Sequence, residues 1–134
     1  MGARRGCQLI LVVWLLGLAT ACQTVPQEGP RPGIVRHVVI LWLKEPGNLE
    51  ARRKLIDSAK TLRAIPEVVD VRAGQVLTQV SPAADTTYDV VLVFGLRDPE
   101  AVKTYREHPL HKQVLADIVQ PLVSRFVVYD FLEE

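Results

Sequence analysis

The chain has 134 residues, enough for one domain, and a globular composition with 49% hydrophobic and 23% charged residues. Arg4 and Arg5 lie in a hydrophobic N-terminal segment; without them, 14 basic side chains remain against 15 acidic ones, a net charge of −1. Such a domain lacks the basic surface that nucleic-acid binding requires, so we expect no nucleic-acid partner. Both cysteines, Cys7 and Cys22, lie near the N-terminus, which excludes disulfides and cysteine-ligated metal sites from residues 23–134.

The N-terminal segment has the pattern of an export signal. A positively charged start precedes residues 9–18 (LILVVWLLGL), an apolar run about half as long as the ~20 residues that a membrane-spanning helix needs. Small residues at 19–21 then precede Cys22. This arrangement resembles a bacterial lipobox, in which the cysteine thiol receives a diacylglyceryl group and the chain is cut before it. We therefore predict a signal peptide over residues 1–21 and a lipid on Cys22.

The lipobox resemblance departs from the usual pattern at one point. The leucine stands at Leu18, four residues before the cysteine, and Ala19 occupies the usual leucine position. The alternatives are an ordinary secretory signal cut near Ala21, with Cys22 incidental, and an uncleaved anchor. Gln23 rather than an aspartate follows the cysteine, which favours the outer membrane in an organism that has one.

Residues 22–33 are predicted to be a lipid-anchored tether between the membrane and the folded domain. The stretch from Gln23 to Gly33 has three prolines and two glycines, which exclude a helix or a central strand and favour an extended chain. The N-terminal region as a whole predicts a location in the cell envelope, with the membrane as a partner through the lipid on Cys22.

The folded domain is predicted over residues 34–134. Its first strand spans 34–44 (IVRHVVILWLK), which is β-branched and apolar without a breaker. Asn48 then caps a helix whose apolar residues recur at helical spacing until a proline ends it. A second strand over 68–79 and a third over 88–96 follow, joined by a polar loop.

The second half is predicted to be a split helix and a strand. Residues 98–100 (DPE) have the pattern of a helix start, a cap followed by proline and an acid, and this helix extends to about Glu107. Pro109 interrupts it, and Pro121 is expected to kink or restart the next helical stretch. The last strand spans 126–132. The apolar face of the second stretch consists of Leu110, Val114, Leu115, Ile118, Val119 and Leu122.

The order of elements, β-α-β-β-α-β, predicts a ferredoxin-like α+β fold with an antiparallel sheet and helices on one face. The first strand is apolar on both faces, because Val38, Ile40 and Trp42 lie on one and other aliphatic residues with His37 on the other. A sheet with two apolar faces needs a second cover, and another copy of the chain is expected to supply it, forming a dimeric α+β barrel. A ligand then has space between helices and sheet, or between the two sheets.

His37, Tyr105 and His111 are the candidate catalytic residues. Each shares a strand or helix face with apolar residues, so all three are expected to point inward. Pro109 bends the chain between Tyr105 and His111, which allows both to border one pocket. A neutral imidazole there can accept a proton, and a phenol can donate a hydrogen bond to a developing oxyanion. The structural alternatives are a buried, hydrogen-bonded or dimer-contact His37, and a Tyr–His pair that only closes the helix bend.

The third histidine, His108, stands at a predicted helix end, where a cationic side chain suits the helix dipole, and we interpret it as structural. It forms an H-x-x-H motif with His111, but Pro109 disturbs the geometry, and only Glu107 or Asp117 is near enough to supply a third ligand. We expect no metal and no cofactor. The sequence has no Gly-rich phosphate loop and no Ser-His-Asp or Cys-His motif.

Several stretches together resemble the stress-responsive A/B barrel (Dabb) domain family, within the dimeric α+β barrel superfamily. A tyrosine followed by H-P-x-H, with a final strand ending in Tyr-Asp-Phe, is a fairly specific part of the pattern. The resemblance covers nearly all of residues 35–132 and implies a homodimer whose sheets form a barrel. The matching stretches are VRHVVILWLK at 35–44, IPEVVDVRAG at 65–74, YDVVLVF at 88–94, YREHPLHKQV at 105–114 and PLVSRFVVYDF at 121–131.

One plant member of this fold, olivetolic acid cyclase, closes a linear polyketide by aldol condensation. By resemblance, its acid–base pair of a Tyr and a His falls on Tyr105 and His111, and its first-strand His falls on His37. Where that enzyme has a further Tyr and a further His, this chain has Ser58 and Val90. We therefore do not expect a polyketide substrate.

Three functional hypotheses follow, and the residues leave open whether the protein is an enzyme. The leading one is a homodimeric Dabb-domain lipoprotein of the cell envelope that binds a small apolar ligand. The second is a cyclase or lyase that uses His111 as base and Tyr105 as hydrogen-bond donor. The third is a purely structural envelope protein, whose dimer face alone matters.

Overall fold

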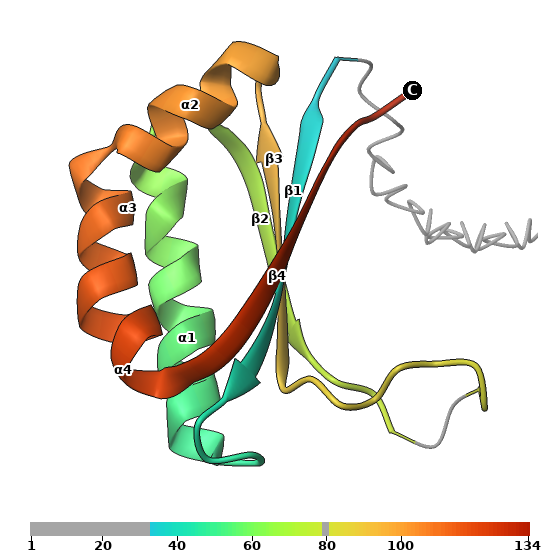
Figure 1. Ribbon diagram of the computed structural model, residues 1–134. Helices are drawn as coiled ribbons and strands as arrows, with labels where there is room; N and C mark the ends of the chain where they lie inside the picture. The colour runs from blue at the N-terminus through green and yellow to red at the C-terminus, as the bar shows by residue number, and fades with distance from the viewer. Residues whose placement is uncertain (1–32, 79–80) are drawn as a thin grey trace, which may run out of the picture.

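The computed structural model describes residues 33–78 and 81–134. The predicted signal peptide, Cys22 and nearly all of the predicted tether lie outside the described residues. The described chain forms a single antiparallel sheet with its helices on one face (Figure 1). Its elements are β1 (Val35–Leu43), α1 (Leu49–Thr61), η1 (Leu62–Ala64), β2 (Val68–Gln75), β3 (Val90–Leu96), α2 (Pro99–Glu107), α3 (Pro109–Val114), η2 (Leu115–Val119), α4 (Gln120–Leu122) and β4 (Val123–Leu132).

The strand order is β2-β3-β1-β4, and every neighbouring pair is antiparallel. The first and last strands of the domain therefore lie side by side, with β4 at one edge of the sheet. This arrangement confirms the predicted ferredoxin-like α+β fold and the β-α-β-β-α-β order of elements.

Local side-chain chemistry sets both predicted helix starts. The Asn48 side chain accepts a hydrogen bond from the Ala51 backbone N–H at 3.0 Å, and α1 begins at the next residue. The Asp98 carboxylate does the same for the Ala101 N–H at 2.8 Å, with proline in the first turn of α2. Both caps were predicted correctly, because capping depends on residues close together in the sequence.

Pro121 does not restart the second helical stretch, which continues from α3 through η2 to α4, but it distorts the turn that precedes it. The turn before the proline, η2, is π-helical, and the Gln120 N–H donates to the Leu115 carbonyl oxygen five residues back. A proline inside a helix lacks an N–H and its ring clashes with the carbonyl four residues earlier, and a wider turn relieves that clash. Five of the six residues of the predicted apolar face pack against the core, and the sixth, Leu115, lines the cavity described below.

Strand boundaries differ from the prediction by more than one residue at three points. β4 begins at Val123 rather than at residue 126, because it pairs along the whole of β1, with a bulge where Leu43 meets Val123. β2 ends at Gln75, short of residue 79. β3 begins at Val90 rather than residue 88, because the buried Asp89 carboxylate turns to accept hydrogen bonds from the backbone N–H groups of Leu43 and Gly47.

The two faces of β1 divide as predicted. Four of the five residues at odd positions, His37, Leu41 and Leu43 among them, are buried beneath the helices, and Val39 is partly buried there. Val38, Ile40 and Trp42 are only partly buried on the opposite face. We call that opposite side of the sheet the open face. From the register of the strands, its apolar residues are Val38, Ile40, Trp42, Val91, Val93, Val127, Tyr129 and Phe131.

An ion network crosses one end of the open face. Arg36 on β1 forms two hydrogen bonds with the Asp70 carboxylate on β2, at 2.7 and 2.9 Å, although β3 lies between those strands. The pair meets directly above Gly95, the β3 residue opposite both. Arg36 also contacts Glu133, just after β4, at 2.7 Å. One guanidinium therefore connects β1, β2 and the segment that follows β4, across the strand β3.

Among the helices that the structure describes, none is long and apolar enough to span a membrane.

Candidate functional site

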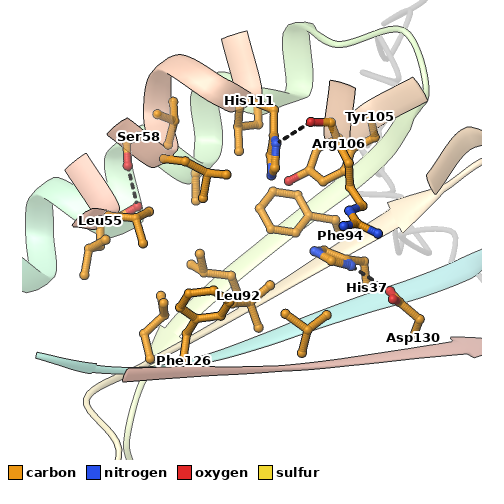
Figure 2. Close-up of a pocket in the computed structure, with 18 residues that line it drawn as sticks. His37, Leu55, Ser58, Leu92, Phe94, Tyr105, Arg106, His111, Phe126 and Asp130 are labelled. Atoms are coloured by element: carbon orange, nitrogen blue, oxygen red, sulfur yellow. Dashed lines mark hydrogen bonds and ion pairs between the residues drawn. The ribbon is translucent and has the colours of Figure 1, made fainter. Parts of the chain in front are cut away.

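A cavity of about 390 Å³ lies between the helix layer and the sheet (Figure 2). Residues from β1, β3, β4, α1, η1, α2, α3 and η2 line it. Phe94 packs into its wall without filling it. Two side chains on the edge strand β4, Phe126 and Val128, line the cavity yet are 56% and 39% exposed, so the cavity opens beside this strand.

His37 reaches this cavity from β1 and is held by Asp130 on β4. The two residues are direct neighbours across the strands, and His37 Nδ1 lies 2.6 Å from Asp130 Oδ1. A carboxylate can only accept a hydrogen bond, so Nδ1 carries the proton and donates it. In the neutral ring, Nε2 is then left as an acceptor. Figure 2 shows this second nitrogen directed into the cavity.

His111 is fixed in the same tautomer by the backbone. Its Nδ1 lies 3.2 Å from the Arg106 carbonyl oxygen, which can only accept, so Nδ1 donates and Nε2 is the free acceptor. The ring is half-buried, and this burial is the main cause that lowers the pKa of His111 below its usual value, with nearby charge on Arg106 adding to it. His111 is therefore a neutral base at physiological pH.

Tyr105 lies between the two histidines. Its ring centroid is 4.5 Å from that of His111 and 5.5 Å from that of His37. The side chain is buried, and this burial raises the pKa of the Tyr105 phenol well above its usual value, so the phenol keeps its proton. Figure 2 shows the hydroxyl directed toward the cavity, below His111.

The structure thus brings the three predicted residues, His37, Tyr105 and His111, to one end of one cavity. This end of the cavity places the imidazole acceptors of His37 and His111 next to the phenolic donor of Tyr105, beside the apolar walls. That combination can remove a proton from a bound molecule and donate a hydrogen bond to an oxygen that gains negative charge.

Two further residues at this end, Asp130 and Arg106, were not identified from the sequence. Asp130 belongs to the site only because the β1–β4 register places it opposite His37, and register is not visible in either strand alone. Its one local signal is a charged residue within the apolar run FVVYDFL of the last strand. Arg106 follows Tyr105 directly, and a helical arginine gives no signal that separates it from an ordinary surface residue.

His108 is structural, but by a different mechanism from the predicted one. Its Nδ1 accepts a hydrogen bond from the Leu110 N–H at 3.1 Å and so caps the start of α3. An accepting nitrogen carries no proton, so this contact requires the ring as an acceptor rather than as a cation at a helix end. Within residues 33–78 and 81–134, no three acidic, histidine or cysteine side chains cluster closely enough to hold a metal ion.

The two positions that depart from the cyclase pattern have different surroundings. Ser58 lines the cavity, and its hydroxyl donates to the Leu55 carbonyl oxygen at 2.9 Å. Val90 is fully buried in the core. At the end of the cavity far from the histidines, the polar group in the lining is therefore the Ser58 hydroxyl, which is already hydrogen-bonded (Figure 2).

Fold and site together define a small α+β domain whose cavity combines apolar walls with one polar end. The chain matches the stress responsive A/B barrel domain over residues 35–133, and it belongs to this Dabb family. No curated protein sequence matches it.

Solved structures support the same assignment. A Dabb family protein with a ferredoxin-like fold from Mesorhizobium loti is 32% identical with a TM-score of 0.61, and the match covers 75% of this chain and 96% of that one. The M. loti protein therefore consists almost entirely of the matched region.

Two more distant neighbours show the fold alone. A dimeric ferredoxin-like protein of unknown function from Thermobifida fusca is 24% identical, with a TM-score of 0.60, over 75% of this chain and 92% of that one. A hydroxynitrile lyase from Passiflora edulis is 18% identical, with a TM-score of 0.62, over 76% of this chain and 94% of that one.

Proposed function

We propose that this protein is a homodimeric, lipid-anchored Dabb module of the cell envelope, and that its cavity binds a small, largely apolar molecule. The observation that carries the proposal is the cavity itself. Its volume of about 390 Å³ falls within the range of small-molecule sites, and its lining has the usual composition of apolar walls with a few convergent polar groups.

Native mass spectrometry of the gently purified domain, residues 33–134, tests ligand binding. The expected result is a dimer that carries a small molecule, released on denaturation and identifiable by its mass. A dimer that stays empty, and that binds no member of a library of small apolar compounds, would contradict the binding proposal and favour a purely structural envelope protein.

The open face supports the proposed homodimer. Val38, Ile40 and Val93 lie near its centre, and Tyr129 and Phe131 are more than half exposed at its β4 edge. A continuous apolar sheet face of this kind is covered in stable proteins, and similar proteins such as that from T. fusca are described as dimeric. A second copy of the chain supplies a cover with the same apolar character.

Analytical ultracentrifugation tests this assembly. Ile40→Lys places a charge at the centre of the open face and is expected to yield a monomer. Leu49→Lys is the matched control, because Leu49 is a 70% exposed apolar residue at the start of α1 and away from this face. A dimer that survives Ile40→Lys unchanged would place the contact elsewhere.

The lipid anchor remains a proposal carried by the sequence around Cys22. Cys22→Ser removes the thiol that would be alkylated, so the variant is expected to lose its membrane attachment in fractionated cells. Mass spectrometry of the wild-type N-terminus should find the acyl groups on the cysteine. A Cys22→Ser protein that stays in the membrane fraction would favour an uncleaved anchor. An anchor in the outer membrane is expected if the organism has one.

An acid–base enzyme is the second candidate, favoured by the fixed tautomers of both histidines. In a cyclase or lyase reaction, His111 Nε2 would take the proton and Tyr105 would donate a hydrogen bond to the developing oxyanion. Asp130 would act as a positioning residue, because it holds the His37 ring at 2.6 Å.

An aromatic hydroxynitrile is a reasonable first probe substrate, since one protein of this fold is a hydroxynitrile lyase. If the chain is a lyase, the hydroxynitrile loses its hydroxyl proton to His111 and its C–CN bond breaks, which releases the aldehyde and hydrogen cyanide. His111→Ala should abolish this release while the dimer persists. Asp130→Asn should shift the pH profile of the remaining activity. Catalysis that is unaffected by His111→Ala would rule out this assignment of roles.

A further inference from the structure

The cavity has two chemically different ends. Around Leu55, Leu92 and Phe126 the lining is apolar, apart from the Ser58 hydroxyl, which is already donated to a backbone carbonyl. The opposite end gathers the cavity's ionisable groups, and Figure 2 shows the two sets separated along its length. The ionisable set consists of His37, Tyr105, Arg106, His111 and Asp130.

The two charged side chains at the polar end, Asp130 and Arg106, differ in whether they have a partner. Asp130 is engaged by His37 at 2.6 Å, so this carboxylate already has a partner inside the site. Arg106 has none, because no carboxylate in the described part of the chain lies within ion-pair distance of its guanidinium. Figure 2 shows that guanidinium at the end of the cavity that holds His37 and Asp130. A guanidinium carries its charge at any physiological pH and favours carboxylate partners.

We infer that the cavity takes an amphiphilic monocarboxylate, with its head group at Arg106 and its hydrocarbon tail among the apolar walls. This inference rests on the proposed ligand-binding function and narrows it to one class of ligand. The Tyr105 phenol can donate to the same carboxylate, so the head group has a charged and a neutral donor. A tail at the opposite end removes apolar surface from water on both molecules.

The cavity volume limits the size of this ligand. At about 30 Å³ per atom, the liquid-volume share of one water molecule, 390 Å³ holds about 13 non-hydrogen atoms. A medium-chain carboxylate such as decanoate fits this limit. A diacyl phospholipid has several times as many atoms as the cavity encloses, so the volume favours a free acid over a membrane lipid.

Isothermal titration calorimetry on the domain tests the inference with two probes, decanoate and decanol, which share a tail and differ in charge. Decanoate is expected to bind at least about tenfold more tightly, a difference that corresponds to about 1.4 kcal/mol. Arg106→Gln should weaken decanoate binding far more than decanol binding and so remove most of this preference, and Arg106→Lys should retain part of it. Lys103→Gln is the matched control, since it removes one positive charge from the same helix outside the cavity.

The outcomes separate this inference from the broader proposal. Equal affinity for both probes, unaffected by Arg106→Gln, would overturn the carboxylate inference and leave the apolar-ligand function standing. Tighter binding of a decyl ammonium ion would overturn it in favour of recognition by Asp130. If neither probe binds at millimolar concentration, both the inference and the proposed function fail for ligands of this shape.

Discussion

Replacing Gly95 with alanine tests how closely the open face is packed around its ion network. A Cβ atom at this position would lie 2.5 Å from Asp70 Oδ2 and 2.9 Å from Arg36 Nη1, closer than real Cβ contacts. The Arg36–Asp70 pair must therefore shift or separate, although its side chains are only 13% and 15% exposed. Breaking a buried ion pair costs about 3–5 kcal/mol, and alanine recovers about 0.5–1 kcal/mol of strand preference. Because Glu133 keeps Arg36 paired, we expect a net loss of about 2 kcal/mol.

Urea denaturation of Gly95→Ala and Gly74→Ala measures this loss. Gly74 is the matched control, because it lies on the same face of the sheet but its added Cβ would meet only a Val91 methyl at 3.9 Å. Gly74→Ala should be neutral or slightly stabilising. In an Asp70→Ala background, the cost of Gly95→Ala should largely disappear. An equal cost in both backgrounds would show that the clash with the ion pair is not the cause.

Two other predictions concern buried hydrogen bonds and pH. Asp89→Ala should lower the free energy of unfolding by about 2–4 kcal/mol in urea denaturation, because it leaves the backbone N–H groups of Leu43 and Gly47 without an acceptor. A loss below about 0.5 kcal/mol would contradict the proposed importance of these two hydrogen bonds. Burial lowers the pKa of His111 in the folded state, so the unfolded chain binds the proton more readily and stability falls as pH drops below the ordinary histidine value of 6.5. His111→Gln should therefore flatten the stability difference between pH 7.5 and pH 5.5, and an unchanged slope would refute the assignment.

The sequence predicted those parts of the fold that depend on neighbouring residues. Asn48 and Asp98 set their helix starts through hydrogen bonds that span three residues, so their roles are visible in the sequence. The alternation of β1 likewise identified His37 as inward-facing. The start of β4 was missed because its pairing with β1 extends the strand beyond what its own composition indicates.

The candidate site was predicted in part, for the same physical reason. His37, Tyr105 and His111 carry their orientation in local periodicity, and the structure places all three at one end of the cavity. Asp130 enters the site through the β1–β4 register, although it lies 93 positions after His37 along the chain. Long-range register of this kind leaves no signal at either residue.

Both cavity histidines have one nitrogen committed outward, His37 to Asp130 and His111 to the Arg106 carbonyl, so each presents its other nitrogen inward. In its neutral ring, the inward nitrogen of His111 attracts hydroxyl and amide protons of a guest molecule. Burial lowers the pKa of His111, so this nitrogen remains an acceptor at an acidity that would protonate an exposed histidine. Once protonated, the same atom attracts oxygens of the guest instead, so the affinities of the cavity for alcohols and for anions should change with acidity in opposite directions.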